Sequence, residues 1–167
     1  HARPGEAMGF SLFNHVAVGT RYAQARGPVQ KILIVDWDVH HGNGTQETFY
    51  DDGDVFYLSL HQSPHFPGTG HEHEAGRGEG SGTTLNVTLS PGTSREEYRE
   101  RFLAALETAG SRFEPDFVFI SCGFDVLAGD PLGGQEVEPE DLHGFTKEVM
   151  VLARRSAGGR VVALLEG

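Results

Sequence analysis

A run of ionisable residues between positions 36 and 41 could hold a metal ion. It reads DWDVHH and directly follows a short apolar segment. Residues two apart in an extended chain point to the same side, so we expect Asp36, Asp38 and His40 to converge. Carboxylates combined with an imidazole suit zinc or a similar divalent ion. The alternative is a polar strand end with a hydrogen-bonded core histidine, but three ionisable groups plus His41 favour a metal site.

A catalytic zinc ion usually has three protein ligands and one open position. Asp38 and His40 supply two of them, and Asp125, after another apolar segment, offers the third. Two carboxylates and a neutral imidazole balance the 2+ charge and leave an ion able to polarise a carbonyl and a bound water. A dinuclear manganese site would need a carboxylate at position 127, where Leu127 stands. One ion is therefore favoured, and these ligands accept either zinc or ferrous iron.

The segments that must position these residues alternate between apolar runs and amphipathic patterns. Buried strands are predicted at residues 31–37, 55–60, 83–89, 117–121 and 160–165. Helices are predicted at residues 10–25, 94–109 and 138–155. This alternation predicts an α/β fold, with a mostly parallel sheet and helices on both of its faces. In such folds ligands bind beyond the carboxyl ends of the strands, where the polar, glycine-rich segments of this chain fall.

The composition excludes several classes of protein. The 167 residues are 38% hydrophobic, too apolar for a disordered acidic tail, and no apolar run reaches the ~18 residues of a membrane-spanning helix. A net charge of −11 argues against direct nucleic-acid binding. It favours cationic partners such as basic peptide tails or polyamines, although solubility alone explains it more simply. A single cysteine leads us to expect an intracellular, cytoplasmic setting without a membrane partner.

The segment at residues 36–46, DWDVHHGNGTQ, resembles the metal-binding signature of the zinc-dependent histone deacetylase superfamily, in its class II-like branch. Supporting motifs follow in the family's order: HA at 1–2, MGF at 8–10, SLH at 59–61, FPGTG at 66–70, GFD at 123–125 and GDPLGG at 129–134. The superfamily includes bacterial histone deacetylase-like amidohydrolases, acetylpolyamine amidohydrolases and acetoin utilisation proteins, to which this sequence is also similar. The resemblance implies an arginase–deacetylase-like fold.

The resemblance also implies a role for individual residues. It implies three zinc ligands, which are Asp38, His40 and Asp125. It implies that His1 is the general base acting on the zinc-bound water and that Asn43 orients it. Asp36 resembles the residue that pairs with the first of two tandem histidines in the family. A monovalent cation site for K⁺ is implied at Asp36, Asp38, His40, Ser59 and Leu60. Pocket positions around an acyl-lysine side chain are implied at Gly9, Phe10, Phe66 and Leu132.

The function implied by this resemblance is zinc-dependent hydrolysis of an N-acetyl amide by metal-activated water. The expected substrate is an acetylated lysine peptide, an acetylated polyamine or a small acetylated amine. A narrow aromatic slot accepts a neutral, flat amide and rejects a charged ammonium group. The base takes a proton from the water, and the tetrahedral intermediate collapses to amine and acetate.

Two positions of the family pattern fall outside residues 1–167. The first tandem histidine would immediately precede His1, and the tyrosine that donates to the oxyanion would follow Gly167. We therefore expect residues 1–167 to be the central part of a single deacetylase catalytic domain, truncated at both ends and inactive by itself. The alternative is a catalytically incomplete, deacetylase-like binding module. The sequence leaves the oligomeric state open, a homo-oligomer included.

Overall fold

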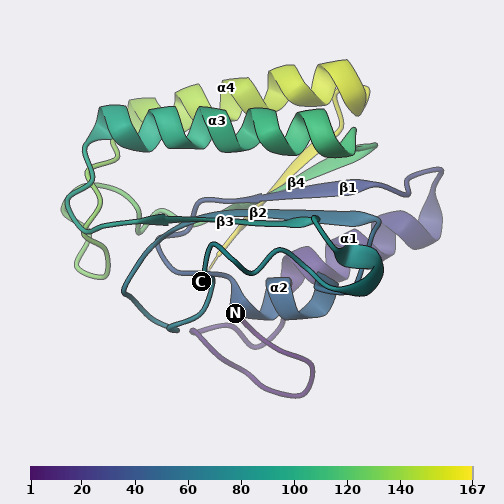
Figure 1. The fold of residues 1–167 in the computed structure, drawn as a ribbon, viewed down its shortest axis with the longest axis horizontal. Coiled ribbons are helices and arrows are strands. Elements are labelled where there is room, and N and C mark those ends of the chain that lie inside the picture. Colours follow the sequence, from purple (N-terminus) through teal and green to yellow (C-terminus); the bar gives the residue numbers. More distant parts are fainter. Residues whose placement is uncertain (167) are drawn as a thin grey trace.

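Five parallel strands form the centre of the structure, which is a computed structural model that describes residues 1–166 (Figure 1). The strands are β1 Ile32–Asp36, β2 Val55–Gln62, β3 Thr84–Leu89, β4 Phe117–Cys122 and β5 Val161–Leu165. Their spatial order is β3-β2-β1-β4-β5, and every neighbouring pair is parallel. All residues of β1 and β2 are buried, as expected for near-continuous apolar runs in the middle of a parallel sheet.

Helices cover both faces of this sheet. In Figure 1, α3 (Arg95–Phe113) and α4 (Pro139–Ser156) lie together above the sheet, and α1 (His15–Arg26) and α2 (Asn43–Phe49) lie below it. A single-turn 3₁₀ helix, η1, spans Gly78–Gly80. Each face therefore has its own apolar core. The larger core packs Phe102 and Phe145 against one face of the sheet, and the smaller packs Val16 and Phe49 against the other.

The predicted α/β fold with a parallel sheet is confirmed, with two corrections to the helices. The predicted helix at residues 10–25 begins at His15, because the Asn14 side chain accepts a hydrogen bond from the Ala17 N–H at 2.9 Å. Helix α2 was not predicted. It has only seven residues and begins inside the glycine-rich segment that follows β1. Short helices of this kind carry too little periodicity to be recognised in sequence.

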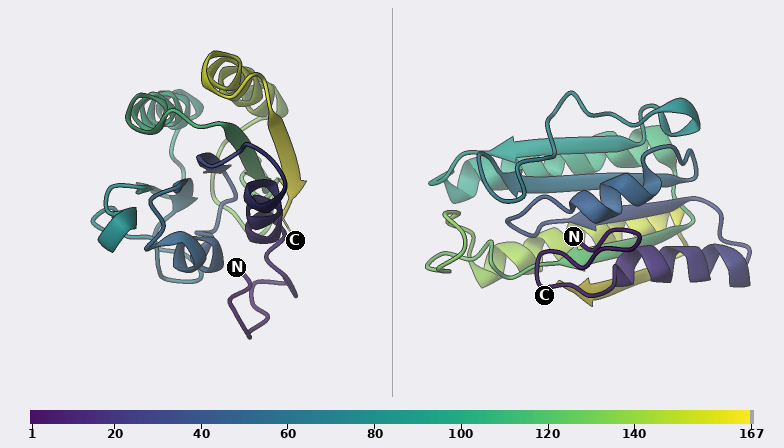
Figure 2. Two further views of the ribbon diagram at one scale, coloured as in Figure 1. Left: turned by 90° about the vertical axis from the view of Figure 1, so that its right-hand side faces the viewer. Right: turned by 90° about the horizontal axis from the view of Figure 1, so that it is seen from below.

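The strand order brings the chain's polar loops to one edge of the sheet. β1 lies between β2 and β4, so the carboxyl ends of these three strands are neighbours. Figure 2 shows the N-terminal segment on the side of the sheet that carries α1 and α2, close to the end of β5. Within residues 1–166, no helix combines the length and the apolar character needed to cross a membrane.

Candidate functional site

The loops that follow β1 and β4 carry the candidate metal ligands. Asp36, the last residue of β1, is paired in the sheet register with Ser121 of β4. Asp38 and His40 lie in the loop after β1, and Asp125 lies in the loop after β4. Because adjacent parallel strands end at the same edge, the two loops meet.

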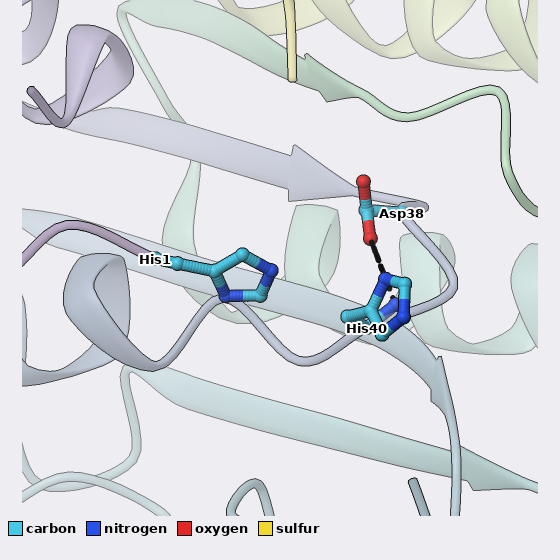
Figure 3. A group of neighbouring side chains, drawn as sticks. All are labelled: His1, Asp38 and His40. Atoms are coloured by element: carbon cyan, nitrogen blue, oxygen red, sulfur yellow. Dashed lines mark hydrogen bonds and ion pairs between the residues drawn. The ribbon is translucent and has the colours of Figure 1, made fainter. Parts of the chain in front are cut away.

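One nitrogen of the His40 ring lies between the carboxylates of Asp38 and Asp125. His40 Nδ1 lies 3.1 Å from Asp38 Oδ1 and 2.9 Å from Asp125 Oδ2. Backbone N–H groups hold both carboxylates: that of His40 donates to Asp38 Oδ1 at 2.8 Å, and that of Val39 donates to Asp125 Oδ1 at 3.0 Å. Figure 3 shows Asp38 and His40 just beyond the end of β1, with the imidazole facing the carboxylate.

The ionisation of these groups follows from burial and from their closeness. Burial raises the pKa of Asp38 to about 6, against the opposing hydrogen bond with His40. Hydrogen bonds to Asp125 and Asp38 raise the pKa of His40 to about 9. Burial also acts to raise the pKa of Asp125, but hydrogen bonds from His40 and Val39 outweigh it and the net pKa is lowered. Two carboxylates around one imidazole thus favour positive charge at this point.

This donor set fits a divalent metal ion. Ligand-capable atoms of His1, Asp38 and His40 lie within 4.8 Å of one another, and Asp125 reaches His40 as well. Carboxylate oxygen and imidazole nitrogen are the ligands zinc takes in many catalytic sites. Within residues 1–166, His1, Asp38 and His40 are the only three such side chains whose ligand atoms all lie this close to one another, and Asp125 joins them only through His40. The residues present can therefore hold one ion.

Asp36 does not join this group, which corrects one expectation. β1 ends at Asp36, so the alternation of an extended strand does not continue through residues 37–40. Asp36 Oδ1 accepts from the Asp38 N–H at 3.1 Å, and Oδ2 accepts from the Tyr57 hydroxyl at 2.8 Å. Burial raises the pKa of Asp36 well above its usual value. The Asp36 carboxylate accepts from the Asp38 N–H, and the Asp38 carboxylate accepts from the His40 N–H. These two successive turns bring Asp38 and His40 close together.

The other residues expected at a monovalent cation site are in β2. Ser59 and Leu60 are fully buried, and Ser59 is paired with Asp36 in the sheet register. The Ser59 hydroxyl lies 2.9 Å from Nδ1 of His61. Cation binding here stays a prediction.

His1 and Asn43 form a hydrogen-bonded pair beside the metal-ligand group. His1 Nδ1 lies 3.0 Å from Asn43 Oδ1, an atom that only accepts, so Nδ1 carries the proton. The Asn43 amide nitrogen donates to the Met8 sulfur at 3.3 Å, which fixes the orientation of the amide. Figure 3 shows the second nitrogen of the His1 ring directed toward His40. Nε2 of His1 is therefore the nitrogen left to accept a proton at the site.

Gly9 packs directly against the His1 ring. A Cβ atom at Gly9 would lie 2.1 Å from Cδ2 of His1, and Gly9 has a φ of +57°. Both the space and the left-handed backbone require glycine. The next residue, Phe10, is also left-handed, with a φ of 61°, and its side chain is 89% exposed.

A cavity of about 420 Å³ opens onto the metal-ligand group. Its lining includes all four residues expected to form a substrate pocket, Gly9, Phe10, Phe66 and Leu132. His1, His40 and Asp125 also line it. The Phe66 ring centroid lies 5.5 Å from that of His1 and 6.0 Å from that of His40. The structure therefore places an aromatic wall beside the candidate base and a candidate ligand.

His65 is a pocket residue that sequence reasoning missed. It is half-buried, it lines the cavity, and its ring centroid lies 4.6 Å from that of His40. Its Nε2 donates to the Leu132 carbonyl oxygen at 2.7 Å. His65 thus joins the Phe66 wall of the pocket to the Leu132 wall. The sequence feature that could have identified His65 is its position immediately before the FPGTG motif.

The parallel sheet, with helices on both faces and a candidate metal site at its carboxyl edge, is that of the arginase–deacetylase fold. The chain matches the histone deacetylase domain over residues 1–167, and it belongs to that family.

Relatives from several organisms support this assignment. The chain is 42% identical over 167 residues to histone deacetylase 10, chloroplastic, of Oryza sativa subsp. japonica, covering 100% of this chain and 38% of that protein. It is 43% identical over 176 residues to histone deacetylase 9 of Homo sapiens, covering 100% of this chain and 17% of that protein. The chain thus spans less than half the length of these curated relatives.

Solved structures agree with the sequence matches. The crystal structure of the HDA15 HD domain superposes with a TM-score of 0.88 at 43% identity, over 100% of this chain and 48% of that one. An HDAC homolog from Aquifex aeolicus superposes with a TM-score of 0.89 at 34% identity, over 100% of this chain and 45% of that one.

Proposed function

We propose that this protein is a zinc-dependent deacetylase that hydrolyses an N-acetyl amide. One observation carries the proposal: Asp38, His40 and Asp125 meet at a single imidazole nitrogen, at a pocket that His1 and Phe66 also line. Membership of the histone deacetylase domain family supports the same reaction. The single, buried cysteine fits the intracellular setting that we also propose.

The three ligands would hold the metal ion by two carboxylate oxygens and by Nδ1 of His40. A zinc ion bound there would polarise the acetyl carbonyl and lower the pKa of a bound water. His40 would bind the ion as a neutral imidazole, so the ion would displace the proton favoured on this ring by the hydrogen bonds to Asp125 and Asp38, which raise the pKa of His40 to about 9.

His1 supplies acid–base chemistry in this proposal. Its Nδ1 proton is held by Asn43, so Nε2 accepts a proton from the attacking water. The same nitrogen then returns the proton to the departing amine. A positioned acid–base group of this kind contributes about 10²–10⁴-fold to the rate.

The pocket selects a neutral acetamide on an alkyl chain. Phe66 and Leu132 offer apolar surface, and Gly9 leaves room for the His1 ring. A charged ammonium group would lose its hydration in such a slot without gaining a partner. We therefore propose acetyl-lysine peptides or acetylated polyamines as substrates, and the net charge of −11 would attract any remaining cationic groups on either substrate.

A second candidate function rests on the pocket lining. Phe66 and Leu132 would contact an acetylated alkyl chain whether or not hydrolysis follows. A module that binds acetylated lysine without hydrolysing it would use the same lining.

One experiment separates the two functions. The complete protein is incubated with an acetyl-lysine peptide and with N-acetylputrescine, with and without a chelator, and acetate release is measured. The deacetylase proposal predicts release that stops with chelator and returns with added zinc. Binding of the acetylated peptide with no acetate released under any metal condition would favour the binding module.

A further inference from the structure

Two buried histidines contact the segment that carries the aromatic wall of the pocket. The segment is Phe66–Gly70, between β2 and β3. His41 follows His40 and is 1% exposed, and His61 lies in β2 and is 2% exposed. The centroids of the two rings are 4.8 Å apart. Neither histidine lines the 420 Å³ cavity, so neither has a role in the proposed chemistry.

The hydrogen bonds of His41 define its tautomer. Nε2 lies 3.0 Å from Oε1 of Gln46, and Nδ1 lies 2.7 Å from Oγ1 of Thr69. An amide oxygen only accepts, so Nε2 is the donor and Nδ1 accepts the Thr69 hydroxyl proton. The exposed Thr69 is thereby tied to a buried ring.

The hydrogen bonds of His61 are equally defined. Nε2 lies 2.9 Å from the carbonyl oxygen of Gly70, which only accepts, so Nε2 carries the proton. Nδ1 then accepts from the Ser59 hydroxyl at 2.9 Å. Both nitrogens of both rings therefore have a hydrogen-bond partner. In each ring, one of these partners belongs to the Phe66–Gly70 segment.

Gly70 shows how closely this segment approaches the rings. It is buried and left-handed, with a φ of +84°. A Cβ atom there would lie 2.5 Å from Cδ2 of His41 and 2.6 Å from Nε2 of His61. The backbone thus sits against both imidazoles with no space for a side chain between them. Immediately before the segment, His65 Nε2 donates to the Leu132 carbonyl oxygen.

We propose that His41 and His61 are positioning residues that hold the Phe66–Gly70 segment and so set the place of the Phe66 ring in the pocket. Neither side chain lines the cavity, and they act through Thr69 and Gly70. The inference rests on the proposed function for the role of Phe66 as a wall of the acyl pocket. The anchoring of the segment is independent of that function.

The test uses Thr69, because its exposed side chain can be changed without altering the core. Thr69→Val keeps the shape but removes the hydroxyl, and Thr69→Ser keeps the hydroxyl. In the complete protein, Thr69→Val is expected to raise KM for an acetyl-lysine peptide about three- to tenfold and to change kcat less than about twofold. Amide exchange of the segment's four N–H groups, those of Phe66, Gly68, Thr69 and Gly70, becomes faster by a similar factor. Thr69→Ser should keep both KM and the amide exchange rates close to the wild-type values.

A matched control and a second pair of variants complete the test. Thr108→Val removes a hydroxyl that bonds within α3, to Ala104, and should leave KM and the exchange of residues 66–70 unchanged. His61→Gln places an amide N–H near the former Nε2 and should keep the exchange slow. His61→Leu offers no donor and should make it fast.

The outcomes separate this inference from the proposed function. If the wild-type protein releases acetate but Thr69→Val has the same KM and the same amide exchange rates, the positioning role is overturned. The proposed deacetylase function is then unaffected. If the wild-type protein releases no acetate, the deacetylase proposal fails, and the exchange rates alone decide whether the histidines hold the segment.

Discussion

Oδ2 of Asp125 lies 2.9 Å from Nδ1 of His40, although the two residues follow different strands. The contact exists because β4 and β1 are neighbours in the sheet and run parallel. It makes Asp125 part of the same group as Asp38, with His40 between the two carboxylates. Metal binding should therefore depend on the loop after β4 as strongly as on the loop after β1.

Replacing Asp125 with alanine should weaken zinc binding by at least about a hundredfold, because the loss of an orienting partner alone costs 10–100-fold. Calorimetric titration of the metal-free protein with zinc measures the change. Glu136→Gln is the matched control, since Glu136 is an exposed acid in the same loop. Equal affinity in Asp125→Ala and wild type would show that the ion binds elsewhere.

Asn43 should control the orientation and the protonation of His1. Asn43→Leu removes the acceptor for Nδ1 and should lower kcat about ten- to hundredfold, with a smaller change in KM. In Asn43→Asp, a carboxylate beside the ring favours the protonated imidazole, so the acidic limb of the pH–rate profile should move to higher pH. Profiles of kcat against pH for the three proteins test both statements. An unmoved acidic limb in Asn43→Asp would argue that His1 is not the base.

Gly9 and Gly5 offer a matched pair of substitutions. Both are left-handed, but a Cβ atom at Gly9 would meet the His1 ring, whereas one at Gly5 would have nothing within 4 Å. Both alanine variants should lose about 1 kcal/mol of stability from backbone strain. Only Gly9→Ala should also lower kcat/KM, by about tenfold or more. Urea unfolding and initial rates distinguish the two effects, and equal rates in the two variants would exclude the predicted displacement of His1.

Asp116 should make the stability of the protein sensitive to acid. Its Oδ2 accepts hydrogen bonds from the Lys31 and Gln30 N–H groups at 3.0 Å and 3.1 Å, and these lower the pKa of Asp116. A lowered pKa in the folded state stabilises the fold above the unfolded pKa of about 4, and this stabilisation is lost as the pH falls through the lower folded value.

Asp116→Asn removes the charge and keeps an acceptor oxygen. The variant should be less stable than wild type above pH ~4, and the difference should shrink as the pH falls further. Urea midpoints measured from pH 2.5 to 7 test this dependence. A gap that stays constant over the whole range would mean that the charge of Asp116 does not contribute.

Local patterns in the sequence were sufficient for the class of fold. Near-continuous apolar runs such as residues 31–37 indicated buried parallel strands, and a serine followed by glutamates at 94–97 indicated the start of α3. These signals are local, since burial on both faces and helix capping depend on a few adjacent residues. The sequence did not predict helix α2 or the start of α1 at His15. A seven-residue helix and a single capping asparagine leave only weak sequence patterns.

The sequence by itself determined which side chains are available: the carboxylates and imidazole of a metal site, and the aromatic residues of a pocket. Only the tertiary structure decided which of them meet. The turns after β1 direct Asp36 to Tyr57 and leave Asp38 beside His40. The strand order places Asp125 next to them. Periodicity describes which face of an element is buried, but contacts between distant residues depend on how the elements pack against one another.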